Sequence, residues 1–290
     1  MPAVDDADAM RRSDAFGAFE RAGWNEGRAA PYHAALGAIT ARPVEALLDA
    51  AGVGPGVRVL DVASGPGYAA ARAAARGAEV VGVDFSGEMV ALARELHPGI
   101  EFREGDAAAL AFEDGAFDAV IANFLMPHVS DLPAVARELA RVTRGGGRVA
   151  LTTWDAEGAV YARAVPEAVV AAGAAPPADL PPGPPFFQYA DDNGFEGLLS
   201  GAGLADVSVS EFSFGHRMDD LDAFFDGFIA GTVRMNALVT RQPAEVQARI
   251  RAEYARLLER YRAADGGFEV PCVVKVGSGA RLDARDPARV

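Results

Sequence analysis

Cysteine and long apolar runs are nearly missing from this chain of 290 residues. Cys272 is the only cysteine, which excludes an intrachain disulfide and favours a reducing, cytoplasmic location. No run of about 18 apolar residues occurs, so we expect no membrane-spanning helix. The first residues also lack the apolar stretch of a secretory signal. The sequence therefore predicts a cytoplasmic protein.

Positive charge is scarce as well. Lys275 is the only lysine, and the formal net charge is −14 at pH 7. A protein that binds nucleic acid needs a basic face, and an acidic surface is repelled by anionic lipid. We therefore expect a small-molecule substrate as the partner, with neither nucleic acid nor membrane, and we leave a homodimer open.

Strand-like and helix-like segments alternate between residues 57 and 154, which predicts a parallel sheet covered by helices. Half of the residues are apolar (50%), enough for a large core. The expected strands are 57–62, 79–84, 100–104, 117–122 and 148–154, and the expected helices are 67–76, 86–96 and 132–143. Outside this core we expect helices at 16–23, 43–50 and 195–202, two more within 220–262, and strands at 207–214 and 268–276.

A glycine-bearing turn follows the first expected strand. Gly65 and Gly67 stand between that strand and a helix, and the second strand ends in Asp84. Glycine lets backbone N–H groups at a helix N-terminus approach a ligand closely, and an acid at a strand end can bind two ribose hydroxyls. These features predict a nucleoside site at the carboxyl edge of the sheet. Because Asp61 precedes the turn and the third glycine is missing, the turn is not the dinucleotide fingerprint.

The turn resembles motif I of the class I S-adenosylmethionine (SAM) methyltransferases, and the resemblance extends over residues 55–154. Later segments resemble the family's other motifs in the same order: Val80–Met89, Gly105–Ala107 with Leu110–Phe112, Phe117–Val120, and Arg137–Val142 with Gly145–Arg148. The chain departs from the pattern at Ala63, where a glycine is usual, and at Thr143-Arg144, where Leu-Lys-Pro is usual. Within the family, the chain looks most similar to the methyltransferase type 11-like enzymes that tailor small molecules.

The resemblance implies an α/β fold: a Rossmann-like, seven-stranded, mostly parallel sheet with helices on both faces. It also implies a helical insertion between strands six and seven and an N-terminal helical lid. We expect the lid at 1–51, the SAM-binding core at 52–214 and 264–290, and substrate-binding cap insertions at 155–192 and 215–263. SAM is the implied cofactor and S-adenosylhomocysteine its product; the methyl donor needs no metal.

Several residues are implied cofactor contacts because they occupy the family's motif positions: Asp61, Ala63, Gly65, Gly67, Asp84, Phe85, Met89, Asp106, Ala107, Asn123 and Phe124. Asp84 is expected to bind the ribose hydroxyls, with a surface turn acid as the alternative. Phe85 and Met89 are expected to flank adenine, or else to belong to the core. Asp106 and Ala107 are expected near the adenine amino group, and Asn123 and Phe124 near the methionine end.

Histidine is the natural general base near neutral pH, and the sequence has four. His128 lies in the loop after strand four, where the family often places substrate-facing residues; the alternative is a structural cap for the helix that starts after Asp131. His33 lies in the expected lid, and His216 follows strand six. His97 precedes Pro98-Gly99, which predicts a surface turn residue. The catalytic candidates are therefore His128, His33 and His216.

Aromatic and basic residues outside the motifs are candidates for binding the acceptor. Aromatic side chains can wall an apolar site, and arginines can bind a carboxylate or diphosphate. The candidate substrate-binding residues are Tyr32, His128, Phe186, Arg217 and Arg234. Ordinary core packing and solvated surface charge are the alternatives for the aromatic and basic members.

The function that the sequence predicts is SAM-dependent methyl transfer to a small molecule, in bacterial specialised metabolism. A C-methyltransferase of an isoprenoid alkene or prenyl diphosphate is the alternative within the class. A SAM-binding cyclase or pericyclase on the same scaffold, and a non-catalytic regulatory binder, are alternatives from other classes.

Overall fold

The computed structural model describes residues 6–283, with side chains from residue 15 onward. The chain divides into two compact units. The sheet unit contains residues 40–156, 184–212 and 274–283, and the helical unit contains 6–39, 157–183 and 213–273. The roles of the 1–51, 155–192 and 215–263 segments as lid and cap stay predictions.

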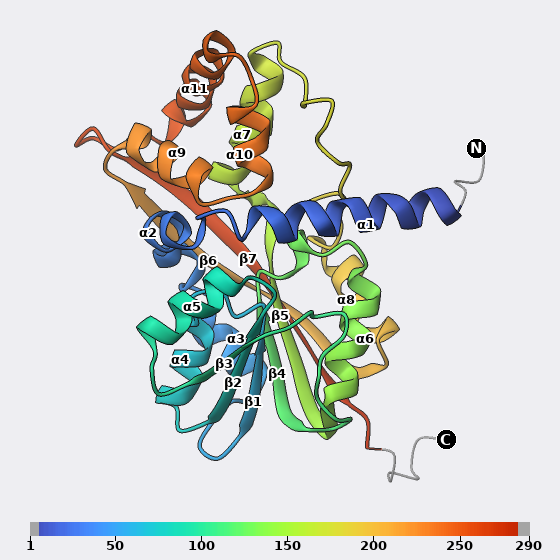
Figure 1. The fold of residues 1–290 in the computed structure, drawn as a ribbon. Helices are drawn as coiled ribbons and strands as arrows, with labels where there is room; N and C mark the ends of the chain where they lie inside the picture. Colours follow the sequence, from blue (N-terminus) through green and yellow to red (C-terminus); the bar gives the residue numbers. More distant parts are fainter. Residues whose placement is uncertain (1–5, 284–290) are drawn as a thin grey trace. The chain divides into compact units, whose positions relative to one another are not determined.

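A seven-stranded sheet has the order β3-β2-β1-β4-β5-β7-β6 (Figure 1). The strands are β1 Arg58–Val62, β2 Glu79–Asp84, β3 Glu101–Glu104, β4 Phe117–Asn123, β5 Thr143–Ala159, β6 Leu204–Met218 and β7 Phe268–Arg281. Four neighbouring pairs are parallel: β1 with β2, β1 with β4, β2 with β3, and β4 with β5. This order confirms the expected Rossmann-like fold, although β5, β6 and β7 extend beyond their expected ranges.

Strands β6 and β7 pair in opposite directions within the sheet unit. Ser208 Oγ lies 3.3 Å from Ser278 Oγ, and Ser210 Oγ lies 3.5 Å from Val276 O. From Ser208 to Ser210 the residue number rises along β6, while the partner residue number falls from Ser278 to Val276 along β7. The two strands are therefore antiparallel. The sheet is therefore mixed but mostly parallel, as the resemblance implied.

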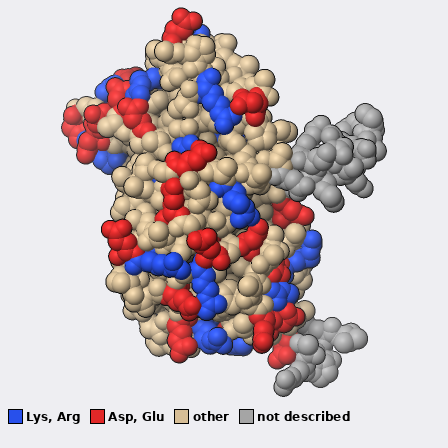
Figure 2. Space-filling model, viewed as in Figure 1, with Lys and Arg blue, Asp and Glu red and all other residues tan. Residues whose placement is uncertain are grey.

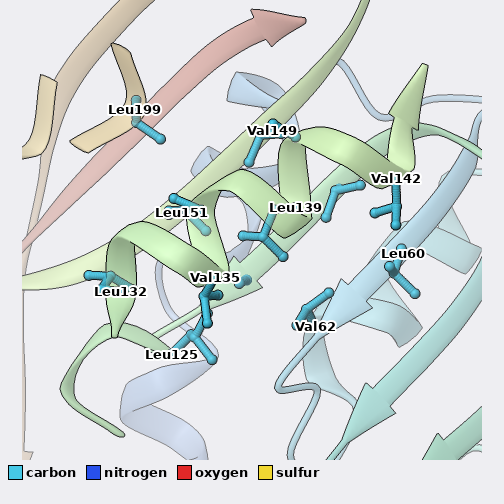
Figure 3. Close-up of a cluster of buried hydrophobic side chains, with 14 of the residues drawn as sticks. Leu60, Val62, Leu125, Leu132, Val135, Leu139, Val142, Val149, Leu151 and Leu199 are labelled. Atoms are coloured by element: carbon cyan, nitrogen blue, oxygen red, sulfur yellow. The ribbon is translucent and has the colours of Figure 1, made fainter. Parts of the chain in front are cut away.

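Helices cover both faces of the sheet. The helices of the sheet unit are α3 Val44–Ala50, α4 Tyr68–Ala75, α5 Gly87–Leu96, α6 Leu132–Val142 and α8 Asp192–Gly201, with a short 3-10 helix η1 at Met126–His128. On one face, Leu60 and Val62 of β1 pack with Leu139 of α6 (Figure 3). On the other face, Val59 packs with Leu47 of α3. Side chains of β1 thus alternate between two buried clusters, as expected for a strand covered on both sides.

Helices dominate the other unit. They are α1 Asp6–Gly23, α2 Ala29–Thr40, α7 Val160–Ala171, α9 Leu221–Ala230, α10 Arg234–Thr240 and α11 Ala244–Leu258, followed by the 3-10 helix η2 Glu259–Tyr261. Tyr32 and His33 lie on α2, a helix outside the expected helical ranges; its Pro31 falls in the first turn, where no backbone N–H is required. One expectation is wrong in this unit. Residues 220–262 hold three α-helices and not two. No helix within residues 6–283 is long and apolar enough to cross a membrane.

Candidate functional site

The turn between β1 and α4 has an unusual backbone. Ala63, Gly65 and Gly67 have positive φ angles of 55°, 50° and 84°. Ser64 N donates a 3.0 Å hydrogen bond to Val83 O of β2, so the turn is attached to the neighbouring strand. Ala63 adopts the left-handed conformation at the position where the family usually has glycine, which costs about 1 kcal/mol or more.

The two glycines of the turn differ in their surroundings. A Cβ at Gly67, the N-cap of α4, would lie 2.7 Å from Phe102 Cζ and 2.9 Å from His97 Cδ2. A Cβ at Gly65 would have no atom within 4 Å. Glycine is therefore required at Gly67 by packing, whereas at Gly65 it leaves open space beside the backbone.

Asp84, at the end of β2, is bound to this turn. Its side chain is buried, and its Oδ2 accepts a 2.8 Å hydrogen bond from Gly65 N. Its Oδ1 accepts a 2.9 Å hydrogen bond from Ser86 N. Burial raises the pKa of Asp84, while these N–H groups and the nearby His128 side chain lower it. Asp84 thus connects the turn, the end of β2 and the start of α5, and because it is buried, the alternative of a surface turn acid is wrong.

His128 is electrostatically close to Asp84. It ends η1 in the loop after β4, and its side chain is near enough to contribute to lowering the pKa of Asp84. The alternative role as the helix cap is wrong, because Asp131 Oδ1 accepts a 2.9 Å hydrogen bond from Ala134 N and caps α6 itself. The fold therefore brings a histidine from after β4 and an acid from the end of β2 into one electrostatic environment.

Asp61 of β1 is the most deeply buried acid of the site, with 1% exposure. Its Oδ2 accepts a 2.9 Å hydrogen bond from Ala70 N, while its Oδ1 has no hydrogen-bond partner among the described residues. Burial is the main reason that the pKa of Asp61 is raised to about 7; the hydrogen bond from Ala70 N opposes the shift, and the nearby charge of Asp84 adds to it. A buried carboxyl oxygen without a partner is available to a ligand.

The expected adenine contacts fall into two groups. Met89 is 4% exposed and belongs to the core, whereas Phe85 is half-buried. Asp106 Oδ1 accepts a 2.9 Å hydrogen bond from Ala108 N, which fixes the turn after β3, and Ala107 packs against the hydrophobic core. Of the two expected adenine-flanking side chains, only Phe85 is therefore partly accessible.

Asn123 ends β4 and Phe124 follows it, and both side chains contact neighbouring residues. Asn123 Nδ2 donates to Thr40 O at 2.8 Å, and Asn123 Oδ1 accepts from Thr152 Oγ1 at 2.7 Å. Phe124 has a φ of 58° and stacks on Trp154, with ring centroids 4.2 Å apart. These contacts show a structural role for both residues at the carboxyl ends of β4 and β5; their cofactor role stays a prediction.

The remaining candidates lie outside the motifs in the sequence. Tyr32 contacts Trp24 edge-on at 5.6 Å, and His33 is exposed on α2. His216 packs at 5.4 Å from Phe224. Phe186, in the sheet unit, contacts Phe187 at 4.8 Å.

The two candidate arginines have different surroundings. Arg217 forms 2.8 Å ion pairs with Asp219 and with Asp265, so its charge is compensated. Arg234 is half-buried and donates to Pro181 O at 2.9 Å. Burial lowers its pKa, and Glu20 raises it. Within residues 6–283, no group of three histidine, cysteine or acidic side chains is placed to hold a metal ion.

His97 precedes the turn at 98–99, as expected, but it is half-buried and not simply a surface residue. It is the C-cap of α5, its Nε2 is buried, and its ring centroid lies 6.4 Å from that of Phe102. The same ring limits the space at Gly67. No local signal marks this contact, because it depends on how α5 and β3 pack beside the turn.

Comparisons with known proteins agree with this geometry. A family profile described as "Methyltransferase domain" matches residues 60–151. A demethylmenaquinone methyltransferase of Beutenbergia cavernae is 47% identical over 110 residues, which are 38% of this chain and 46% of that protein. A demethylmenaquinone methyltransferase of Streptomyces griseus is 34% identical over 176 residues, which are 58% of this chain and 75% of that protein. The YcgJ protein of Bacillus subtilis has a similar fold, with a TM-score of 0.56 at 18% identity over 83% of this chain and 98% of its own.

A mostly parallel sheet with an acid-linked glycine turn at its carboxyl edge defines a Rossmann-like, nucleoside-binding domain. Within that class, this chain belongs to the class I SAM-dependent methyltransferases. The expected family and its cofactor, SAM, are thereby confirmed. The matches to the first relatives span less than half of those proteins, 46% of the Beutenbergia cavernae enzyme and 42% of a Mycobacterium bovis protein.

The residues present suit that cofactor. Open space beside Gly65 permits close approach to the backbone, and the unpartnered Asp61 Oδ1 can accept a hydrogen bond from a cationic amino group. Asp84 supplies a carboxylate at the strand end beside them. The three groups lie on adjacent strands and one turn, so a single nucleoside-bearing ligand can meet all of them.

Proposed function

We propose that this protein transfers the methyl group of SAM to a small-molecule acceptor and releases S-adenosylhomocysteine. The observation that carries the proposal is the hydrogen bond between Gly65 N and Asp84 Oδ2, beside the unpartnered Oδ1 of Asp61. It joins the glycine turn and the strand-end acid into one preformed site at the carboxyl edge of β1 and β2.

The cofactor contacts follow from this arrangement. We assign Asp84 to the ribose hydroxyls, Asp61 Oδ1 to the amino group, and the turn of Ala63, Gly65 and Gly67 to the backbone approach. Phe85 and Asp106 are assigned to adenine, with Met89 and Ala107 packing behind them. Asn123 and Phe124 are assigned to the methionine end, where they also hold β4 against β5.

SAM supplies an activated methyl group on a sulfonium. In-line transfer of that group requires the protein chiefly to align the acceptor and to exclude water. A hydroxyl or amine acceptor also loses a proton, and His128 is the first candidate to accept it, because it shares the electrostatic environment of Asp84. His33 and His216 are the further candidates, and no metal is assigned.

The acceptor is assigned as a small molecule. The relatives named demethylmenaquinone methyltransferases support an acceptor of that kind. On the face drawn in Figure 2, acidic and basic side chains are interspersed, without the broad basic area that nucleic acid would need. A role in bacterial specialised metabolism, a cytoplasmic location and a homodimer stay predictions.

The arginines argue against the alternative of an isoprenoid diphosphate as the acceptor, because two of the three candidates are already paired with carboxylates. Arg217 is paired with two carboxylates, and Arg241 pairs with Asp179 at 2.8 Å. Arg234 is left as the half-buried candidate for an anionic group. No specific observation favours a cyclase or a regulatory binder.

Labelled SAM tests the proposal directly. Purified protein is incubated with SAM that carries a tritiated methyl group and with a panel of phenols, amines and quinols, demethylmenaquinone analogues included, and S-adenosylhomocysteine release is followed in parallel. We expect label in an acceptor, and a strong loss of transfer in Asp84→Asn. Glu79→Gln, at the exposed opposite end of β2, is the matched control and should transfer normally. SAM binding without transfer to any acceptor would favour the cyclase or binder, and absence of SAM binding would refute the proposal.

A further inference from the structure

The segment between β3 and β4 contains Asp106, the residue assigned to adenine. Residues 105–116 belong to neither a helix nor a strand, so their position depends on contacts with other parts of the sheet unit. The first part forms a tight turn: Ala109 N donates to Asp106 O at 3.0 Å, and Ala108 N donates to Asp106 Oδ1 at 2.9 Å. Leu110 follows this turn directly, and from there two side chains of α6 bind the segment.

Glu138 of α6 binds the backbone at Leu110. Its Oε1 accepts a 2.7 Å hydrogen bond from Leu110 N, and its side chain is 15% exposed. The hydrogen bond from Arg141 lowers the pKa of Glu138, so the group is a carboxylate near neutral pH. A hydrogen bond from an N–H group to a carboxylate is stronger than one between neutral partners. Glu138 therefore fixes the point at which the segment leaves the turn of Asp106.

Arg141, one turn further along α6, binds the same segment through its guanidinium. Its Nη2 donates to Leu110 O at 3.0 Å, and its Nη1 donates to Phe112 O at 2.9 Å and to Asp114 Oδ1 at 2.7 Å. The remaining N–H groups bond to Glu138, from Nη2 at 2.7 Å and from Nε at 2.8 Å. Every N–H group of the guanidinium thus has an acceptor on this segment or on Glu138. Lysine cannot reproduce this pattern, because its ammonium is a compact charge and not a planar fork.

The helix that carries these two side chains is firmly held. Val135 and Leu139 of α6 are buried against the sheet (Figure 3), and Asp131 caps the start of the helix. Glu138 and Arg141 are three residues apart, so they are neighbours on the surface of the helix. The segment after Asp106 is therefore bound to an element whose own position is set by the core.

The chemistry of adenine makes the position of this segment important. The adenine amino group donates hydrogen bonds, and the carboxylate of Asp106 accepts them. Such a bond weakens steeply as its angle bends away from linear. Because the turn of residues 106–109 joins Asp106 to Leu110, a displaced Leu110 would displace the carboxylate as well. The contacts of Glu138 and Arg141 can therefore influence which base the site accepts.

We propose that Glu138 and Arg141 are positioning residues that set the preference of the site for adenine. They hold the segment 110–114 in place, and through it the carboxylate of Asp106; they act through Asp106 and not by contact with the cofactor. This inference rests on the proposed function, because it takes the ligand to be SAM, and it adds which residues select the base of that ligand.

Two ligands that differ at one position of the base test the inference. S-adenosylhomocysteine carries the amino group of adenine, and S-inosylhomocysteine has an oxygen in its place, so a donor becomes an acceptor. Calorimetry gives the ratio of their dissociation constants. We expect the wild type to prefer S-adenosylhomocysteine roughly tenfold or more, because the other ligand loses a hydrogen bond to a charged group. Arg141→Gln and Glu138→Ala should each reduce this preference at least about threefold, because the bond to Asp106 is no longer aligned.

Conservative variants separate a positioning role from a purely structural one. Glu138→Gln keeps an oxygen that can accept from Leu110 N, and it should retain more of the preference than Glu138→Ala. Arg141→Lys should fall between the wild type and Arg141→Gln, because an ammonium keeps the charge but does not match the acceptors of the fork. A purely structural role predicts instead that both ligands bind more weakly by the same factor, with their ratio unchanged.

Arg144→Gln is the matched control. Arg144 also combines an ion pair, with Asp118, and a hydrogen bond to a carbonyl, Gly145 O at 3.0 Å, but these partners lie outside the segment 110–114. This variant should leave the ratio unchanged. Circular dichroism verifies that each variant is folded, and the two conservative variants decide the outcome if a larger change unfolds the protein.

The outcomes distinguish the inference from the proposed function. Equal affinity of the wild type for the two ligands would overturn the inference and leave the proposed function standing. A wild-type preference that survives unchanged in the folded Glu138 and Arg141 variants would do the same. Failure of the wild type to bind either ligand would refute the proposed function itself.

Discussion

Gly65 N donates a 2.8 Å hydrogen bond to Oδ2 of Asp84 and so joins the turn after β1 to the end of β2. The same carboxylate accepts from Ser86 N, at the start of α5. The turn after β1, the end of β2 and the start of α5 are therefore held together by one side chain. Replacing that side chain should affect stability and cofactor binding together, and the two effects can be separated by the choice of substitution.

Asp84→Ala should raise the dissociation constant of SAM at least tenfold, because a charged contact to the ribose hydroxyls, worth roughly 1.5–3 kcal/mol, is lost. It should also lower stability by about 1–3 kcal/mol for each N–H group left without a partner. Asp84→Asn keeps one acceptor oxygen and should lose less stability while still binding SAM weakly. Calorimetry with SAM and urea unfolding measure the two effects; unchanged SAM affinity in both variants would refute the ribose assignment.

The two glycines of the turn should respond differently to replacement by alanine. Gly65→Ala places its methyl group in open space, so stability should fall only by the cost of positive φ, about 1 kcal/mol. SAM affinity should fall markedly, because the methyl group occupies the approach to the backbone. Gly67→Ala meets Phe102 and His97 and should lose more stability than Gly65→Ala.

Urea unfolding and titration with SAM measure the stability and the SAM affinity of Gly65→Ala and Gly67→Ala. Gly99→Ala is the control for the general effect of replacing a glycine, since its Cβ has no atom within 4 Å and its φ is not positive. Normal SAM affinity in Gly65→Ala would show that the cofactor does not approach the turn.

Asp61 should make the stability of the free protein depend on pH. Its pKa is raised from 3.8 to about 7 in the folded state, so between these values the folded protein holds a proton that the unfolded chain has released. The free energy of unfolding should therefore fall as the pH rises through this window, with a slope of at most about 1.4 kcal/mol per pH unit. Asp61→Asn should lack this contribution, which the difference between the two unfolding profiles isolates.

SAM affinity should show the opposite trend. The amino group of SAM is cationic, so it favours ionised Asp61, and affinity should rise as the pH rises through about 7. Binding near this pH should release a proton, which calorimetry in buffers of different ionisation enthalpy detects. Asp61→Asn should bind more weakly and without proton release; proton release by this variant equal to that of the wild type would exclude Asp61 as its source.

His128→Ala should lower kcat by roughly 10²–10⁴-fold if His128 is the general base, and the acid limb of the rate profile should lose a group near pH 6.5. Stability should change little, because Asp131 caps α6. Asp131→Ala is the complementary variant: it should lose about 1 kcal/mol of stability and keep kcat. A near-native kcat in His128→Ala would mean that His33 or His216 is the base, or that the reaction needs only alignment of the acceptor and no base.

Much of the fold could be predicted because its signals are local. The short, mostly apolar runs at 57–62 and 117–122 mark buried strands, and Asp131 with Pro133 marks the start of α6. The helical unit was harder to predict, because α7 and the full length of α2 have weaker signals and depend on packing within that unit. The contact of His97 with Phe102 was missed for the same reason, because a turn sequence gives no indication of which ring packs beside it.

By itself, the sequence determined the order of strands and helices in the core between residues 57 and 154, the glycine turn and the positions of Asp61, Asp84 and Asp106, since these follow from residue type and spacing along the chain. Only the tertiary structure decided the protonation of Asp61, because a pKa depends on burial and on neighbouring charges that the fold brings near. It alone brought Glu138 and Arg141 of α6 to the segment after Asp106, because these contacts depend on how the helix packs beside that segment. Local patterns specify backbone conformation, whereas long-range packing sets the chemistry of the side chains.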